Sequence, residues 1–84
     1  MAGVMLSLEA QAQLDALPKA VRARVHKLIG RLRKWPAVSG AKPLRYELAG
    51  HYRMRTGDYR LQFRLKGETV LVERIGHRDG FYEG

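Results

Sequence analysis

Arginines recur at alternate positions in the second half of the sequence, and this spacing could build a binding site for a phosphate. Arg53 and Arg55 lie two residues apart, and Arg60 follows the turn-forming pair Gly57-Asp58. If that pair closes a two-residue hairpin, Arg55 lies opposite Arg60 on one face of a sheet. Like charges that face each other across strands are destabilising, so the cluster suggests a bound anion. A solvated face, partly neutralised by Glu73 opposite Arg60, explains the same pattern equally well.

A second group of chemically useful side chains follows the last predicted strand. Gly76 ends that strand, and His77, Arg78 and Tyr82 lie in the short polar segment after it. An imidazole titrates near neutral pH, a guanidinium can stabilise charge that develops on a phosphate, and a tyrosine ring can stack on a base. Each residue also has an ordinary explanation, as an exposed histidine, a surface arginine and a terminal aromatic packed on the core. The sequence shows no nucleophile triad, glycine-rich phosphate loop or carboxylate pair.

Two helices are predicted ahead of these residues. The first follows Ser7, a plausible N-cap, and the second begins at Pro18, which suits a first helical turn. Apolar residues recur in the second helix at a spacing of three to four and predict a buried stripe, while lysines and arginines fill the opposite face. The stripe consists of Val21, Val25, Leu28, Ile29, Leu32 and Trp35. Residues 36–43 break the pattern and are predicted to form a loop.

From Leu44 onward the hydrophobic period becomes two, which predicts strands. Alternating segments cover residues 44–48, 52–55, 59–65 and 69–75, and the hairpin register places Arg53 opposite Gln62. A short strand-like start, residues 4–7, precedes the two helices. The last segment has apolar residues at both parities and is predicted to be a central strand. The expected fold class is therefore α+β, with the order β-α-α-β-β-β: a small antiparallel β-sheet with two N-terminal helices packed on one face.

Composition narrows the class of protein further. The chain of 84 residues is short enough to need one continuous core, so a single domain over residues 1–84 is expected. It has no cysteine and no metal-ligand spacing among its histidines, so neither a metal nor another cofactor is expected. No secretion signal or membrane span is recognised, which favours the cytoplasm. The net charge of +8, with eleven arginines to five lysines, favours a polyanionic partner.

Two blocks of this sequence resemble the RelE/ParE superfamily of bacterial toxins from type II toxin–antitoxin modules. They are residues 48–61 (LAGHYRMRTGDYRL) and residues 74–82 (RIGHRDGFY), and a weaker likeness covers residues 8–18. The resemblance spans nearly the whole chain. It implies the fold of that family, a small antiparallel sheet with two helices on one side, in agreement with the order of elements expected above.

RelE-type toxins cleave mRNA in the ribosomal decoding site with the RNA 2′-hydroxyl as the nucleophile. By position, the resemblance implies that Arg53 and Arg55 occupy the basic positions of the catalytic strand. Arg60 would bind the scissile phosphate, Arg78 would stabilise the transition state or the leaving group, and Tyr82 would stack on or orient a base.

This sequence departs from the best-known family pattern, which has lysines at the positions of Arg53 and Arg55. Arginine is effectively never deprotonated, so these two residues would act electrostatically. The general base would then be His77, Tyr82 or no single residue, and His77 is the preferred choice because an imidazole suits the task. An exposed bystander histidine is an equally good reading.

The resemblance favours a ribosome-dependent mRNA endonuclease that inhibits translation. Two alternatives remain open: a ParE-type inhibitor of DNA gyrase that binds gyrase without cleaving RNA, and a non-catalytic basic RNA-binding module. The implied partners are the ribosome, mRNA and a cognate antitoxin, an acidic and partly disordered protein that wraps the basic surface. No membrane partner is expected. The residues expected to bind RNA are Arg22, Lys27, Arg31, Lys34, Arg45 and Arg64.

Overall fold

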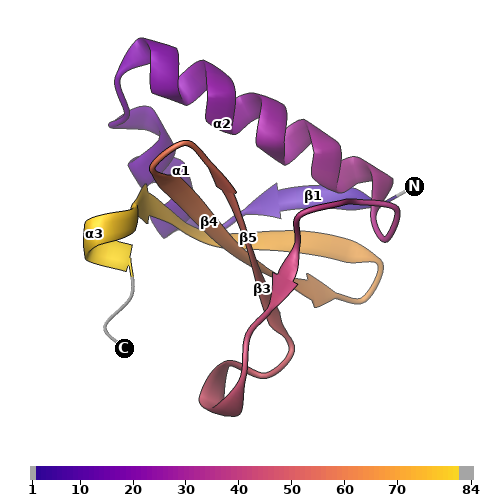
Figure 1. The fold of residues 1–84 in the computed structure, drawn as a ribbon. Coiled ribbons are helices and arrows are strands. Elements are labelled where there is room, and N and C mark those ends of the chain that lie inside the picture. The colour runs from indigo at the N-terminus through magenta and orange to yellow at the C-terminus, as the bar shows by residue number, and fades with distance from the viewer. Residues whose placement is uncertain (1, 82–84) are drawn as a thin grey trace.

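Five strands form one mixed sheet, and two helices cover one of its faces (Figure 1). The computed structural model describes residues 2–81, and its sheet has the strand order β1-β5-β4-β3-β2. The strands are β1 (Gly3–Leu6), β2 (Lys42–Pro43), β3 (His51–Thr56), β4 (Tyr59–Lys66) and β5 (Thr69–His77). The helices are α1 (Leu8–Asp15), α2 (Lys19–Arg31) and the short α3 (Arg78–Phe81), with 3₁₀ turns at Leu32–Lys34 and Tyr46–Leu48.

Both predicted N-terminal helices are present and begin where the sequence indicates. Ser7 caps α1, because its hydroxyl accepts a hydrogen bond of 2.9 Å from the backbone N–H of Ala10. The same hydroxyl donates to the carbonyl of Glu73 at 2.7 Å, so the cap also fastens the helix to β5. Pro18 precedes α2 directly, one position earlier than the first turn to which the sequence assigned it. The predicted apolar stripe of α2 supplies Val25 and Leu28 to the core.

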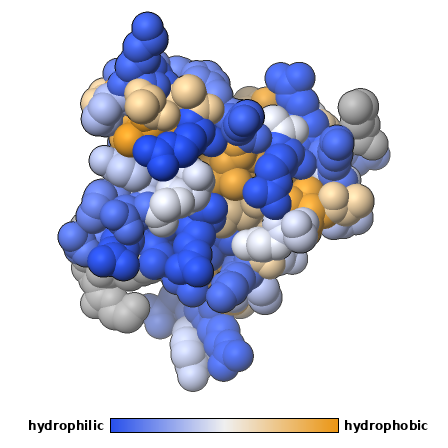
Figure 2. All heavy atoms as spheres, turned by 45° about the horizontal axis from the view of Figure 1, so that its top comes forward, coloured by the Kyte–Doolittle hydropathy of each residue, from blue (hydrophilic) through white to orange (hydrophobic). Residues whose placement is uncertain are grey.

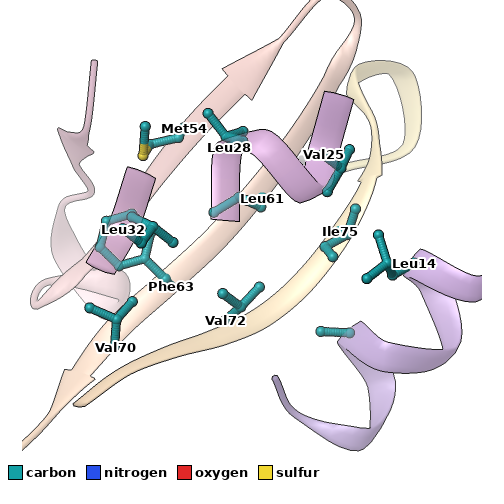
Figure 3. Packing of buried hydrophobic residues seen from close by; sticks show 11 residues of the cluster. Leu14, Val25, Leu28, Leu32, Met54, Leu61, Phe63, Val70, Val72 and Ile75 are labelled. Carbon is teal, nitrogen blue, oxygen red and sulfur yellow. The ribbon is translucent and has the colours of Figure 1, made fainter. Parts of the chain in front are cut away.

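The core lies between the helices and one face of the sheet, called here the inner face (Figure 3). Strand alternation sends every second residue of β3 and β4 toward the helices, and most of these residues are apolar. In β5 the buried residues are Val70, Val72 and Ile75. The buried cluster consists of Ala10, Leu14, Val25, Leu28, Leu32, Met54, Leu61, Phe63, Val70, Val72 and Ile75. The other residues of the same strands form the outer face, which no helix covers in Figure 1 and which carries the arginines.

The α+β class and the element order are confirmed, and the structure adds the direction of the first strand. Strands β3, β4 and β5 form the predicted antiparallel meander, whereas β1 pairs with β5 in parallel, so the sheet is mixed. As predicted, β5 is an interior strand, flanked by β1 and β4. No helix within residues 2–81 has the length and hydrophobicity needed to cross a bilayer.

The predicted strand at residues 44–48 is wrong. Among the described residues, only Lys42 and Pro43 pair with β3 on the side away from β4. One further hydrogen bond of 2.9 Å runs from the N–H of Leu44 to the carbonyl of His51. Tyr46 then adopts a φ of 59° and starts a 3₁₀ turn, so the alternating pattern ends in solvent. The side chain of Tyr46 is 87% exposed, which removes the packing that an amphipathic strand would gain.

Candidate functional site

Four cationic side chains surround a small pocket on the sheet. Arg53, Arg55, Arg60 and Lys42 line it together with Gly40 and Met54, and its volume is about 40 Å³. We call this hollow the arginine pocket. The three arginines are those that the sequence analysis placed on one face, whereas Lys42 and Gly40 belong to a segment predicted to be a loop. Lys42 and Pro43 are the only described residues that pair with β3 on the side away from β4. No strand pattern in the sequence indicates this pairing.

The register of the β3–β4 hairpin brings these charges together. Gly57 has a φ of 59°, which a glycine adopts without strain, and this allows a two-residue turn in which Thr56 pairs with Tyr59. Arg55 consequently lies opposite Arg60, and Arg53 lies opposite Gln62, as the sequence predicted. On the other side of β3, Lys42 pairs with Arg53. The Nε atom of Arg60 is buried, while Arg55 is exposed.

Glu73 does not face Arg60, and this prediction of the sequence analysis is wrong. Between the pairs Phe63–Val72 and Gln62–Arg74, strand β5 contains one extra residue, Glu73, so a β-bulge shifts the register. Gly76 lies opposite Arg60 instead. The sequence carries a sign of this bulge, because the buried apolar positions change parity between Val72 and Ile75. The sequence analysis interpreted that change as a central strand.

The bulge directs the Glu73 carboxylate to a polar network that the sequence did not predict. Glu73 Oε1 shares a hydrogen bond of 2.6 Å with His51 Nδ1 and accepts one of 3.1 Å from Gln62 Nε2. Its second oxygen lies 3.3 Å from Arg64 Nε. Arg74 Nε donates to the Gln62 side-chain oxygen at 3.3 Å, so three strands are cross-linked beside the arginine pocket. The available signal was that His51 precedes Arg53 by two residues and must share its face.

The two described tail residues, His77 and Arg78, have different partners. Arg78 begins α3, and its N–H donates to the carbonyl of Asp58 at 2.7 Å, which ties the tail to the β3–β4 turn (Figure 1). Its guanidinium lies 3.8 Å from the carboxylate of Asp58 and 3.6 Å from that of Asp79. His77 pairs with Tyr59, whose parity is that of the inner face, and the two rings meet edge to face at 5.2 Å. Tyr82 lies outside the described residues.

The other residues expected to bind RNA are spread over the surface. Lys27, Lys34 and Arg45 are exposed, while Arg64 is held by Glu73. Arg22 donates to the carbonyl of Asp15 at 3.3 Å, and Arg31 donates to the carbonyl of Ser39 at 2.7 Å. Figure 2 shows mainly hydrophilic side chains with small hydrophobic areas between them.

The chemistry available at the arginine pocket is electrostatic. Its guanidinium groups can bind an anion and stabilise charge that develops on it, but they cannot accept a proton at neutral pH. Within residues 2–81, no group of three or more histidine, aspartate or glutamate side chains is arranged to hold a metal ion.

A family model described as the ParE toxin of the type II toxin–antitoxin system parDE matches residues 4–80. The chain belongs to this toxin family. The toxin is 39% identical over 82 residues to Toxin RelG of Mycobacterium tuberculosis, covering 94% of this chain and 93% of the relative. The resemblance to the RelE/ParE superfamily noted from the sequence is thereby confirmed.

Solved structures show the same fold for this toxin. The toxin–antitoxin complex RelBE2 of Mycobacterium tuberculosis contains a chain with a TM-score of 0.80 and 36% identity, covering 92% of this chain and 91% of that one. The isolated RelE toxin of E. coli matches with a TM-score of 0.77 and 17% identity over 92% of this chain and 84% of its own. At that lower identity the likeness concerns the fold alone.

Proposed function

We propose that this toxin is a ribosome-dependent mRNA endonuclease with the arginine pocket as its active site. The observation that carries the proposal is the convergence of Arg53, Arg55, Arg60 and Lys42 on one small pocket. Such a constellation suits a phosphodiester whose charge grows in the transition state. The name of the 39% identical relative, Toxin RelG, supports the nuclease over a gyrase inhibitor.

In the proposed reaction the RNA supplies its own nucleophile. The 2′-oxygen attacks the adjacent phosphorus, the bond from phosphorus to the 5′-oxygen breaks, and the products are a cyclic phosphate and a 5′-hydroxyl. Arg60 would bind the scissile phosphate, since it lines the pocket and its Nε atom is buried. Arg53 and Arg55 add charge stabilisation from the neighbouring strand. Where no side chain acts as base or acid, one water molecule accepts the proton of the 2′-hydroxyl and another donates a proton to the leaving 5′-oxygen.

Two tail residues complete the proposed site. Arg78 is held next to the β3–β4 turn by Asp58 and would stabilise the transition state or the leaving oxygen. His77 could serve as a base only after the tail rearranges on the ribosome, because its ring packs against Tyr59 on the other side of the sheet. Tyr82 keeps the proposed role of stacking on or orienting a base.

We also propose a cognate antitoxin as a partner. A 36% identical chain was solved in a toxin–antitoxin complex. An acidic, partly disordered antitoxin would neutralise the net charge of +8 as it wraps the basic surface, and it would block the arginine pocket. Co-expression of the neighbouring small open reading frame should therefore abolish the toxicity of this chain.

The decisive experiment measures cleavage of mRNA in a cell-free translation reaction. Arg60→Ala removes a guanidinium of the pocket and should lower the cleavage rate by about 10²–10³-fold, the range for one lost transition-state donor. Arg78→Ala should also lower it. Arg33→Ala is the control, because this exposed residue lies on the 3₁₀ turn after α2 and outside the pocket. Thermal unfolding would establish that all three variants are folded.

Three other results would contradict the proposed function or its active site. Full activity of both Arg60→Ala and Arg78→Ala would overturn the assignment of the active site. Intact mRNA accompanied by gyrase-dependent DNA breaks would identify a gyrase inhibitor instead. RNA binding with a steep salt dependence but no cleavage on ribosomes would identify a binding module.

A further inference from the structure

A second cationic hollow lies between α2 and the edge of β3. One helical stripe, with residues three and four positions apart, supplies Arg24, Lys27, Leu28 and Arg31 to it, and the strand supplies Arg55 and Thr56. Its volume is about 190 Å³. We call this hollow the helix–strand groove.

The groove is open because the sheet ends there. Strand β2 pairs only with Tyr52 and Arg53, so among the described residues Met54–Thr56 have no strand beside them on that edge. Helix α2 faces this edge, and the β3–β4 hairpin approaches it closely in Figure 1. A Cβ atom added to Gly57 would lie 3.6 Å from Arg24 Nη1, so the guanidinium of Arg24 rests beside the hairpin turn.

The helix–strand groove and the arginine pocket share one lining residue. Arg55 lines both hollows. Together their walls contain seven cationic side chains and, within residues 2–81, no acidic one: Arg24, Lys27, Arg31, Lys42, Arg53, Arg55 and Arg60. A cleft lined by one sign of charge focuses the electric field and concentrates the opposite charge.

The lining favours a nucleic-acid backbone over a protein segment. A protein that docks in a groove needs apolar or aromatic anchors in a desolvated centre. Leu28 is the only aliphatic hydrophobic residue that lines the helix–strand groove, and it is 3% exposed, so it offers almost no apolar surface. Guanidinium groups, in contrast, form paired hydrogen bonds with successive phosphates of a flexible strand.

We infer that the helix–strand groove binds the backbone phosphates of the same RNA strand that enters the arginine pocket. This subsite rests on the proposed function, and it extends the footprint of the toxin beyond the nucleotides being cleaved. Arg55 is the junction, because it can contact phosphates on both sides. Arg24 and Lys27 hold the strand as it runs between α2 and the open edge of β3.

The test compares two charge-matched double variants. Arg24→Ala with Lys27→Ala removes one arginine and one lysine from the groove. Lys19→Ala with Arg33→Ala removes the same charges from exposed positions on α2 and the following 3₁₀ turn that line neither hollow. Arg31 is left intact because its hydrogen bond to the carbonyl of Ser39 supports the adjacent loop.

The probes are uncleavable 2′-O-methyl RNA strands, one a dinucleotide and one of about ten nucleotides, within the site sizes that single-strand binders cover. Fluorescence anisotropy over a series of salt concentrations gives the affinity and its salt slope. The groove variant should lose affinity for the long probe alone, and its salt slope should fall by about 1.4, or 0.7 for each of two lost phosphate contacts. The control variant should keep the slope of the unmodified toxin.

Several results would overturn the subsite. An equal loss of RNA affinity in the control variant would indicate that only the overall positive charge matters. If the groove variant lost affinity equally for both probes, Arg24 and Lys27 would act at the arginine pocket. Equal affinity of the unmodified toxin for both probes would exclude an extended path. Weakened binding of polyglutamate with unchanged RNA binding would make the groove a protein-binding surface. In each case, retained cleavage on ribosomes would show that the proposed function survives without this subsite.

Discussion

The inner and outer faces of the sheet are built by the same strands but meet opposite physical demands. On the inner face Met54, Leu61 and Phe63 are at most 2% exposed and pack against the helices. On the outer face Arg55 and Arg60 lie directly opposite each other, an arrangement that works against stability. Because strand alternation separates the two sets, a substitution on one face should change stability and one on the other should change binding. The predictions below test that division.

The largest expected effect is on the inner face. Phe63 is fully buried, stacks on Tyr52 at 5.4 Å and meets Trp35 edge to face at 5.4 Å. Phe63→Ala should lower the free energy of unfolding by about 3–5 kcal/mol, because it removes apolar contacts and leaves a cavity. Denaturant unfolding measures the change. Leu8→Ala, at a side chain that is 93% exposed, is the control and should change it little. A similar loss in both variants would contradict the assigned core.

A smaller effect is expected where the outer face does contribute to stability. Glu73→Gln removes the carboxylate that holds His51, Gln62 and Arg64. The free energy of unfolding should fall by about 1.5–3 kcal/mol, the range for hydrogen bonds to a charged group. Chemical denaturation measures it, with Glu68→Gln in the exposed β4–β5 turn as the control. If Glu73→Gln cost as much as Phe63→Ala, the division between the faces would fail.

The smallest effect should have the opposite sign. Arg55→Gln relieves the repulsion with Arg60 and should stabilise the folded toxin by about 0.2–1 kcal/mol. The gain should shrink at high salt, since Arg55 is exposed and screening weakens the repulsion. The same variant should cleave mRNA more slowly. Chemical denaturation at two salt concentrations measures the free energy of unfolding, with Arg33→Gln as the control. A lower free energy of unfolding for Arg55→Gln would contradict the prediction and show that Arg55 stabilises the fold.

The sequence was sufficient wherever a feature depends on residues close together in the chain. The cap at Ser7 and the two-residue turn at Gly57-Asp58 are local, and the turn alone fixes the pairing of Arg55 with Arg60. Features that depend on distant pairing were missed. The bulge at Glu73 depends on how β5 fits against β4, so the face shared by His51 and Arg53 did not by itself reveal the contact with Glu73.

The arginine pocket shows the same limit. Its three arginines follow from alternation, but Lys42 joins them through pairing with Arg53 across a segment that has no strand pattern. The alternation at residues 44–48 misled in the opposite direction, because an amphipathic pattern forms a strand only where a neighbouring surface receives its apolar side chains. Tyr46 has no such surface and is exposed.

The parallel pairing of β1 with β5 has a consequence for the folding of this toxin. Gly3 pairs with Thr69 and Leu6 pairs with Val72, so the two helices and the β3–β4 hairpin lie between the paired segments along the chain. Contacts between such distant segments form late in folding. The hairpin that carries Arg55 and Arg60 can therefore form before β1 closes the opposite edge of the sheet.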